Sequence, residues 1–100
     1  MRIIAKKHLT AYGKKRPDAD QALRAWHDEA VNADWRSPND VKAQYRNASI
    51  VGNNRVVFNI KGNDYRLIVA VAYRFGAVYI KFIGTHAEYD KIDAATVAME

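Results

Sequence analysis

The chain has 100 residues, of which 49 % are hydrophobic and none is cysteine, and its formal net charge is +5. This length suits one domain covering residues 1–100, and the apolar content excludes a disordered tail. The lack of cysteine excludes disulfides, thiol catalysis and thiolate metal sites, and fits a cytoplasmic protein. No apolar run approaches the roughly 20 residues that a membrane helix needs, and we expect no secretory signal at the N-terminus.

The positive charge is unevenly distributed along the chain. Residues 1–16 contain six basic and no acidic side chains, residues 17–34 contain one basic and five acidic ones, and residues 35–91 contain nine basic and four acidic ones. A basic surface of this kind favours a polyanionic partner, with nucleic acid first. Many small basic domains bind no polyanion, so the charge alone does not decide the function.

A short strand and two helices are predicted at the start of the chain. Residues 2–4 suit a strand, and residues 6–15 have an apolar stripe at helical spacing. Pro17 separates this helix from a second one, for which Asp18 is the predicted N-cap and which runs to about Asn32. The second helix has acidic residues away from its buried stripe.

The next segment predicts a short helix and then a change to strands. Ser37 is the expected cap and Pro38 the first residue of a helix that ends near Tyr45. From Ser49 onward the pattern is that of β-structure. The predicted strands and turns are a turn at 52–54, strands at 55–61, 64–74 and 77–84, and two-residue hairpin turns at Gly62-Asn63 and Phe75-Gly76.

The two turns predict the register of the strands and therefore the two faces of the sheet. The expected pairs are Val57 with Ile68, Asn59 with Arg66, Lys61 with Asp64, Ala70 with Lys81, and Ala72 with Tyr79. One face is then almost entirely apolar: Val56, Phe58, Ile60, Tyr65, Leu67, Val69, Val71, Tyr73, Val78, Ile80 and Phe82. The first two helices are the obvious cover for it. The predicted fold class is α+β, a small antiparallel sheet packed on one face by the N-terminal helices, with a short C-terminal helix.

The other face of the predicted sheet is mixed and basic. Its residues are Arg55, Val57, Asn59, Lys61, Arg66, Ile68, Ala70, Ala72, Arg74, Tyr79, Lys81 and Ile83. Several cations with an aromatic ring among them suit contacts with phosphates and bases. An ordinary solvated sheet face has the same composition, so that alternative stays open at this point.

The stretch Thr85-His86-Ala87-Glu88-Tyr89-Asp90 follows the last predicted strand. Thr85 and Glu88 have the spacing of a capping box, which predicts the start of a helix. His86 and Tyr89 are not needed for capping, and at spacing i, i+3 they share one face of that helix. A histidine titrates near neutrality and transfers protons readily, so His86 is the candidate acid or base.

Two blocks of sequence resemble the HigB-type toxins of type II toxin–antitoxin pairs, in the RelE-like group of mRNA interferases. The blocks are Phe58-Asn59-Ile60-Lys61-Gly62-Asn63-Asp64-Tyr65-Arg66 and Thr85-His86-Ala87-Glu88-Tyr89-Asp90, at matching separation. The resemblance covers essentially the whole chain, including Lys42. It implies a RelE-like fold, cleavage of mRNA during translation on the ribosome, and inhibition of translation. It also implies a helix-turn-helix antitoxin of HigA type, through which alone operator DNA is bound.

The chemistry that the resemblance implies needs no metal or other cofactor. The RNA 2′-hydroxyl attacks the neighbouring phosphate, which requires a base, an acid and cations that stabilise the added negative charge. Arg66 is the expected charge stabiliser and His86 the acid or base, while Tyr89 orients the phosphate or shares proton transfer. Lys81 and Lys61 are expected to bind the backbone and the dianionic state. The residues expected to position RNA are Asn59, Asn63, Arg55 and Arg74.

Two other classes of function remain open. A non-catalytic RNA- or ribosome-binding module would use the same basic face but would not need His86 or Tyr89. A protein-interaction domain would leave the basic face solvated, and its behaviour toward RNA would not depend on salt. An enzyme with a small-molecule substrate fits least well, because the sequence has no Gly-rich phosphate loop, metal motif or nucleophile elbow.

Overall fold

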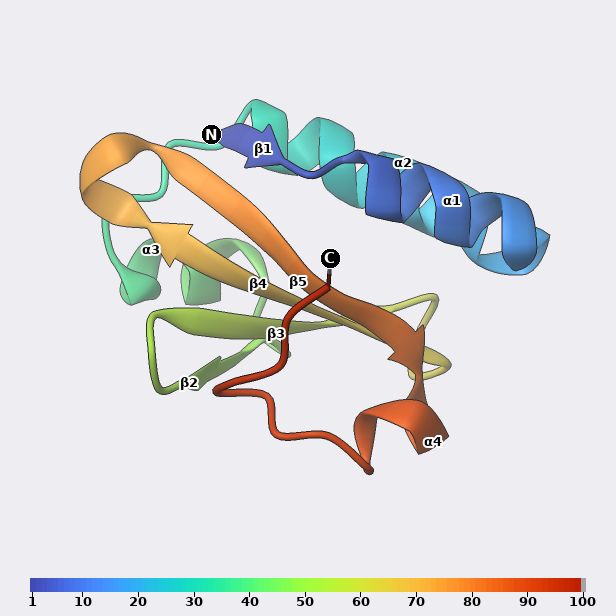
Figure 1. Cartoon of the computed structure of the whole chain (residues 1–100). Helices are drawn as coiled ribbons and strands as arrows, with labels where there is room; N and C mark the ends of the chain where they lie inside the picture. Colours follow the sequence, from blue (N-terminus) through green and yellow to red (C-terminus); the bar gives the residue numbers. More distant parts are fainter. Residues whose placement is uncertain (100) are drawn as a thin grey trace.

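A computed structural model of the chain describes residues 1–99 (Figure 1). The elements are β1 (Arg2–Ile4), α1 (Lys7–Lys15), α2 (Pro17–Val31), α3 (Pro38–Gln44), β2 (Ser49–Val51), β3 (Arg55–Ile60), β4 (Tyr65–Ala72), a 3₁₀ turn (Tyr73–Phe75), β5 (Ala77–Thr85) and α4 (His86–Tyr89). One sheet has the strand order β1-β5-β4-β3-β2. The predicted α+β class is confirmed. Within residues 1–99 no helix has the length and apolar character that crossing a membrane requires.

The sheet is antiparallel except at one edge. β2, β3, β4 and β5 pair antiparallel in chain order, whereas β1 pairs in parallel with β5. The parallel pair arises because α1 and α2 follow β1 and carry the chain across the sheet before the hairpins begin. The sequence predicted the strand at residues 2–4 but not its orientation.

The second helix starts two residues earlier than expected, and the prediction of Asp18 as its N-cap is wrong. Arg16 is at the N-cap position and Pro17 is in the first turn, where a missing backbone N–H costs nothing. The Asp18 carboxylate is therefore available for a distant partner. It accepts a hydrogen bond of 2.6 Å from the Tyr65 hydroxyl and one of 3.2 Å from Lys61 Nζ. The Tyr65 hydroxyl holds the pKa of Asp18 below its ordinary value.

The third helix has the predicted cap position without the predicted cap bond. Ser37 is extended at the N-cap, and its side chain accepts no hydrogen bond from the helix. The Asp40 carboxylate instead accepts from the Arg36 backbone N–H at 2.8 Å. The helix start is thus fixed by an acidic side chain of the first turn, which also suits the positive end of the helix dipole.

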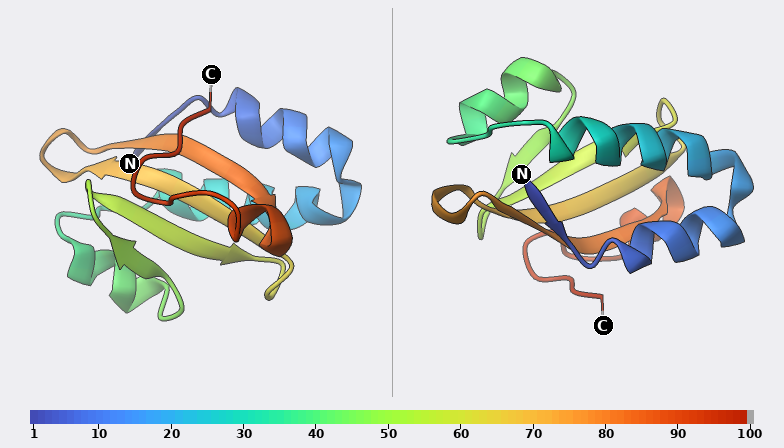
Figure 2. Two further views of the ribbon diagram at one scale, coloured as in Figure 1. Left: turned by 60° about the horizontal axis from the view of Figure 1, so that its bottom comes forward. Right: turned by 90° about the horizontal axis from the view of Figure 1, so that it is seen from above.

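The apolar face of the sheet is buried under helices, as predicted. Leu23, Trp26 and Ala30 of α2 are buried in one cluster with the inward residues of β3, β4 and β5. The Trp26 ring meets Phe58 edge-on at 5.4 Å, an arrangement favoured between aromatic rings. Figure 2 shows α1 and α2 lying side by side over this face.

The first hairpin has the predicted register. Val57 pairs with Ile68 and Asn59 pairs with Arg66. The Asp64 backbone N–H donates to the Lys61 carbonyl at 3.2 Å, which closes a turn centred on residues 62 and 63. Lys61 has a φ of 53°, in the left-handed region that non-glycine residues seldom adopt.

The second hairpin differs from the prediction because its turn is longer. Residues 73–76 form the connection, and Gly76 adopts a left-handed φ of 63°. Ala72 therefore pairs with Ala77, and Ala70 with Tyr79, a shift of two residues from the expected register. A shift of two keeps each side chain on its predicted face.

A β-bulge in β5 then exchanges two side chains between the faces. Ile68 pairs with Phe82 and Val69 with Ile80, so Lys81 is the extra residue. Beyond the bulge, Ile83 is buried in the core and Phe82 is not part of it. The prediction that Phe82 lies inside and Ile83 outside is wrong. Both are large and apolar, so alternation alone does not reveal the bulge.

The segment after α4 crosses the second face of the sheet (Figure 2). Arg55 Nη1 donates to the carbonyls of Ala94 and Val97, and Asn53 Nδ2 donates to the Ala95 carbonyl at 2.7 Å. Val57 and Ile68 on this face are consequently buried, although they are outside the main core. Much of the expected basic face is thus covered by the chain itself.

Candidate active site

A polar cluster forms where β4 begins and β5 ends. We call it the Arg66 cluster, and it contains Asn63, Arg66, His86, Tyr89 and Asp90. The turn that precedes β4 supplies Asn63, β4 supplies Arg66, and α4 with the following residue supplies the other three. β5 delivers α4 to this place because Tyr65 pairs with Thr85 and Arg66 with Gly84.

The predicted capping box holds α4 in position. The Glu88 backbone N–H donates to Thr85 Oγ1 at 3.1 Å, and the Thr85 backbone N–H donates to Glu88 Oε1 at 2.8 Å. The bond from the Thr85 backbone lowers the pKa of Glu88. The His86 backbone N–H also donates to the Asp64 carbonyl at 3.1 Å, which ties α4 to the β3–β4 turn.

Arg66 is the most enclosed member of the cluster, with 9 % of its surface exposed. Its Nη1 donates to the Asn63 carbonyl at 3.0 Å and to the Tyr65 carbonyl at 3.3 Å. Its Nη2 donates to Asn63 Oδ1 at 2.8 Å. The centre of the Tyr89 ring lies 5.7 Å from the guanidinium carbon, within the range of a cation–π contact.

His86 is half exposed and is accompanied by a carboxylate. Its Nδ1 lies 3.1 Å from Asp90 Oδ2, at spacing i, i+4. A carboxylate oxygen at this distance favours a proton on Nδ1, which leaves Nε2 as the nitrogen that accepts a proton. The sequence reasoning missed Asp90, although the i, i+4 spacing from a candidate histidine was available as a signal.

On the second face of the sheet, Asn59 lies beside the cluster and Lys81 lies farther along β5. Lys81 is the bulge residue of β5, and its ammonium lies 5.8 Å from the centre of the Tyr79 ring. Asn59 is exposed on β3 directly opposite Arg66. These two residues are close to where the sequence placed them.

Three predicted RNA-binding cations lie elsewhere or are occupied. Lys61 is paired with Asp18 on the helix side and lies 3.8 Å from Asp64. Arg55 is buried under the C-terminal segment. Arg74 lies in the 3₁₀ turn at the other end of β4, over the Phe75 ring.

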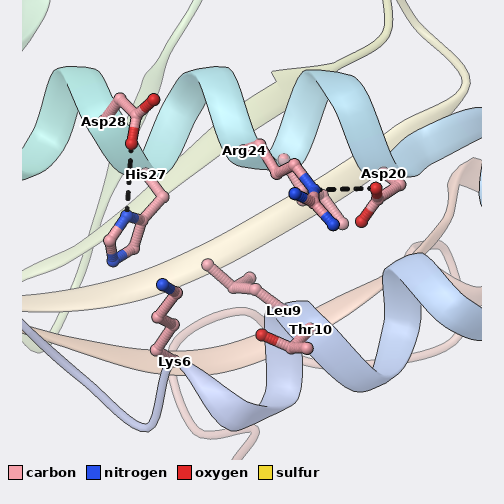
Figure 3. Close-up of a pocket in the computed structure, with 8 residues that line it drawn as sticks. Lys6, Leu9, Thr10, Asp20, Arg24, His27 and Asp28 are labelled. Atoms are coloured by element: carbon pink, nitrogen blue, oxygen red, sulfur yellow. Dashed lines mark hydrogen bonds and ion pairs between the residues drawn. The ribbon is translucent and has the colours of Figure 1, made fainter.

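A cavity of about 330 Å³ opens between α1 and α2, away from the Arg66 cluster (Figure 3). Arg24 pairs with Asp20 at 2.8 Å, and His27 Nδ1 lies 3.8 Å from an Asp28 oxygen. The charged groups of α2 that line the cavity are thus paired with each other. This cavity lies in the helical layer, on the other side of the sheet from the residues with a predicted chemical role.

Comparisons with known proteins point to one family. A family model described as HigB_toxin, the RelE-like toxic component of a toxin–antitoxin system, matches residues 19–92. The mRNA interferase HigB of Escherichia coli O6:H1 is 27 % identical over 94 residues, which cover 92 % of this chain and 91 % of that protein. The mRNA interferase toxin HigB of Escherichia coli K12 and the mRNA interferase HigB of Shigella flexneri are each 27 % identical over 92 residues, covering 90 % of this chain and 88 % of theirs.

Proposed function

Because the chain belongs to the HigB family of RelE-like toxins in toxin–antitoxin systems, we propose that it is an mRNA interferase, an endoribonuclease that cleaves mRNA. The observation that carries this proposal is the Arg66 cluster. It places an enclosed arginine, a tyrosine and a carboxylate-paired histidine at one end of the β4–β5 pair. These are the types of group that are required when the 2′-hydroxyl of the RNA attacks the adjacent phosphodiester.

The proposed reaction is attack of the 2′-hydroxyl on the adjacent phosphorus. The new bond joins O2′ to phosphorus, and the bond from phosphorus to O5′ breaks. The products are a 2′,3′-cyclic phosphate and a 5′-hydroxyl. One proton leaves O2′ and one is delivered to O5′, so the reaction is balanced without a co-reactant.

Each member of the cluster has a role in this reaction. His86 transfers a proton through Nε2, since Nδ1 faces Asp90. Arg66 stabilises the charge that accumulates on the phosphate oxygens in the transition state. Tyr89 orients the phosphate or shares in proton transfer, and its ring holds the guanidinium from one side. Lys81 adds positive charge farther along β5 on the same face.

The RNA path that the structure favours is narrower than the basic face expected from sequence. Lys81, Asn59 and the Arg66 cluster lie on the open part of that face. Arg55 donates to the C-terminal segment and Lys61 to Asp18 on the helix side, so we place both outside the proposed path. Arg74 contacts RNA only if the bound RNA runs along the full length of β4.

The family implies an antitoxin as partner. We propose that it is a helix-turn-helix protein of HigA type, that operator DNA is bound only through it, and that the toxin acts in the cytoplasm on mRNA held by translating ribosomes. The relatives are named mRNA interferases, which supports mRNA as the target. Cleavage of translated messages would inhibit protein synthesis directly.

The test is to induce the wild-type chain in bacteria and map 5′ ends on two copies of one message. One copy has its ribosome-binding site and the other lacks it. New ends on the translated copy alone would support a ribosome-dependent interferase. Ends on both copies would keep the nuclease and remove the ribosome requirement. No new ends with verified soluble protein would overturn the proposal in favour of a binding module.

A further inference from the structure

The Asn63 side chain, expected from the sequence to bind RNA, is bonded to the protein itself. Its Oδ1 accepts from Arg66 Nη2 at 2.8 Å, and its backbone carbonyl accepts from Arg66 Nη1 at 3.0 Å. Asn63 therefore accepts hydrogen bonds from both terminal nitrogens of the Arg66 guanidinium. Bidentate contacts of this kind fix the orientation of an arginine as well as its position.

The hydrogen bonds to Asn63 and Tyr65 leave one edge of the Arg66 guanidinium without a partner within residues 1–99. An arginine has five N–H groups, and the bonds to Asn63 and Tyr65 use two on Nη1 and one on Nη2. Within residues 1–99, Nε and the second N–H of Nη2 have no hydrogen-bond partner. These two N–H groups are parallel and form the side-on fork that matches two oxygens of a phosphate.

The turn that carries Asn63 is itself anchored to the rest of the site. Asp64, the next residue, accepts from the His86 backbone N–H at 3.1 Å and donates to Lys61 through its own backbone N–H. The same short turn thus sets the position of Arg66 through Asn63 and that of α4 through Asp64.

We propose that Asn63 is a positioning residue, which holds the end of the Arg66 guanidinium so that its Nε–Nη2 edge is presented to two non-bridging oxygens of the scissile phosphodiester. Asn63 itself does not contact RNA. This inference rests on the proposed function, and it identifies the phosphodiester as the ligand of a defined edge of Arg66. A guanidinium held before the substrate arrives needs no reorganisation in the transition state.

The test compares Asn63→Ala, Asn63→Asp and the control Asn39→Ala. Two quantities are measured: kcat and KM on an RNA with a mapped cut, and the NMR signals of the Arg66 Nε and Nη groups. In Asn63→Ala we expect kcat to fall by about 10-fold to 100-fold, the scale of a misplaced catalytic group, with little change in KM. The Arg66 Nη signals should lose the resolution that hydrogen bonding confers.

The Asn63→Asp variant distinguishes loss of the hydrogen bonds that place the Arg66 guanidinium from a change in the conformation of the turn at residues 62 and 63. It keeps both acceptor oxygens, so the resolved Arg66 signals should persist, while the added negative charge neutralises the guanidinium and leaves kcat low. The Asn39→Ala protein, which changes an exposed asparagine of α3 with no proposed role, should keep the wild-type Arg66 signals and kcat.

A rise in KM alone in Asn63→Ala, with kcat and the Arg66 signals unchanged, would show direct RNA contact and overturn the inference. Unchanged behaviour in every readout would overturn it as well. If neither the wild type nor any variant cleaves RNA, the proposed function is wrong. The NMR comparison would still decide whether Asn63 fixes Arg66.

Discussion

Arg66 on β4 pairs across the sheet with Gly84 on β5, so on the β5 side no side chain stands opposite the arginine. The glycine is also required by what surrounds it. A Cβ at position 84 would lie 2.6 Å from Phe82 Cζ and 3.1 Å from Glu88 Oε1. The space next to Arg66 is therefore occupied by the Phe82 ring and by the capping box of α4.

Replacing Gly84 by alanine should displace Phe82 and Glu88 and thereby loosen α4. Overpacking of this kind costs about 1–3 kcal/mol, and we expect that loss in the free energy of unfolding measured with urea. Cleavage should fall as well, because α4 carries His86. The control is Gly52→Ala, where an added Cβ meets nothing within 4 Å. Equal stability of the two variants would contradict the proposed contact.

Removal of the His86 imidazole should slow RNA cleavage without weakening RNA binding. General acid–base groups typically contribute about 10²-fold to 10⁴-fold to a rate, and we expect His86→Ala to lose that much in single-turnover cleavage. His8→Ala, which changes a histidine of α1, is the matched control and should cleave normally. A His86→Ala protein that cuts at the normal rate would leave the acid or base unassigned.

The two proposed contributions of Tyr89 are separable by substitution. Tyr89→Phe keeps a ring over the guanidinium, 5.7 Å from its carbon in the wild type, and removes only the hydroxyl. Tyr89→Leu removes both. If the hydroxyl takes part in phosphate orientation or proton transfer, both variants should lose cleavage rate, and only the leucine variant should also change the Arg66 NMR signals. Full activity of Tyr89→Phe would restrict Tyr89 to the contact with Arg66.

The docking of α4 should weaken in acid because of Glu88. Its folded pKa is lowered by the hydrogen bond from the Thr85 backbone. A lowered pKa means that the contribution to stability is present above the unfolded value of 4.5 and is lost as the pH falls through the lower folded value. An NMR titration of the Thr85 amide from about pH 6 to about pH 3 should show this loss. Glu88→Gln should flatten it, and an unchanged titration in that variant would assign the effect elsewhere.

Lys81 should contribute a phosphate contact that depends on salt. Each phosphate contact adds about one unit to the slope of log K against log salt, so Lys81→Ala should reduce the slope of RNA binding by that amount. Lys7→Ala, on the exposed side of α1, should leave the slope unchanged. Equal slopes for Lys81→Ala and the wild type would place the bulge residue outside the RNA path.

The sequence predicted the elements and the core because periodicity reports burial. Leu23, Trp26 and Ala30 recur at helical spacing, and the inward residues of β3 and β4 alternate strictly. The capping box at Thr85 and Glu88 was predictable for the same local reason, since its two residues are three apart in the chain. The pairing of Asn59 with Arg66 followed from a short turn.

The remaining features depend on contacts between distant parts of the chain. The bulge at Lys81 falls between apolar neighbours, so Phe82 and Ile83 exchange faces without any change in the pattern. Asp18 was available to Tyr65 only because α2 begins at Pro17. The backbone carbonyls that cover Arg55 come from residues about forty positions away and leave no trace in side-chain composition.

The most direct test of the central claim is whether RNA cleavage requires Arg66. The 5′ ends of a translated message are mapped after induction of the wild type, Arg66→Ala, Arg66→Gln, and the control Arg24→Ala, at matched soluble levels. Arg66→Gln retains donors for Asn63, which guards against loss of the fold. We predict cuts with the wild type and Arg24→Ala and none, or very few, with either Arg66 variant. Cuts at wild-type frequency in a folded Arg66 variant would contradict the account.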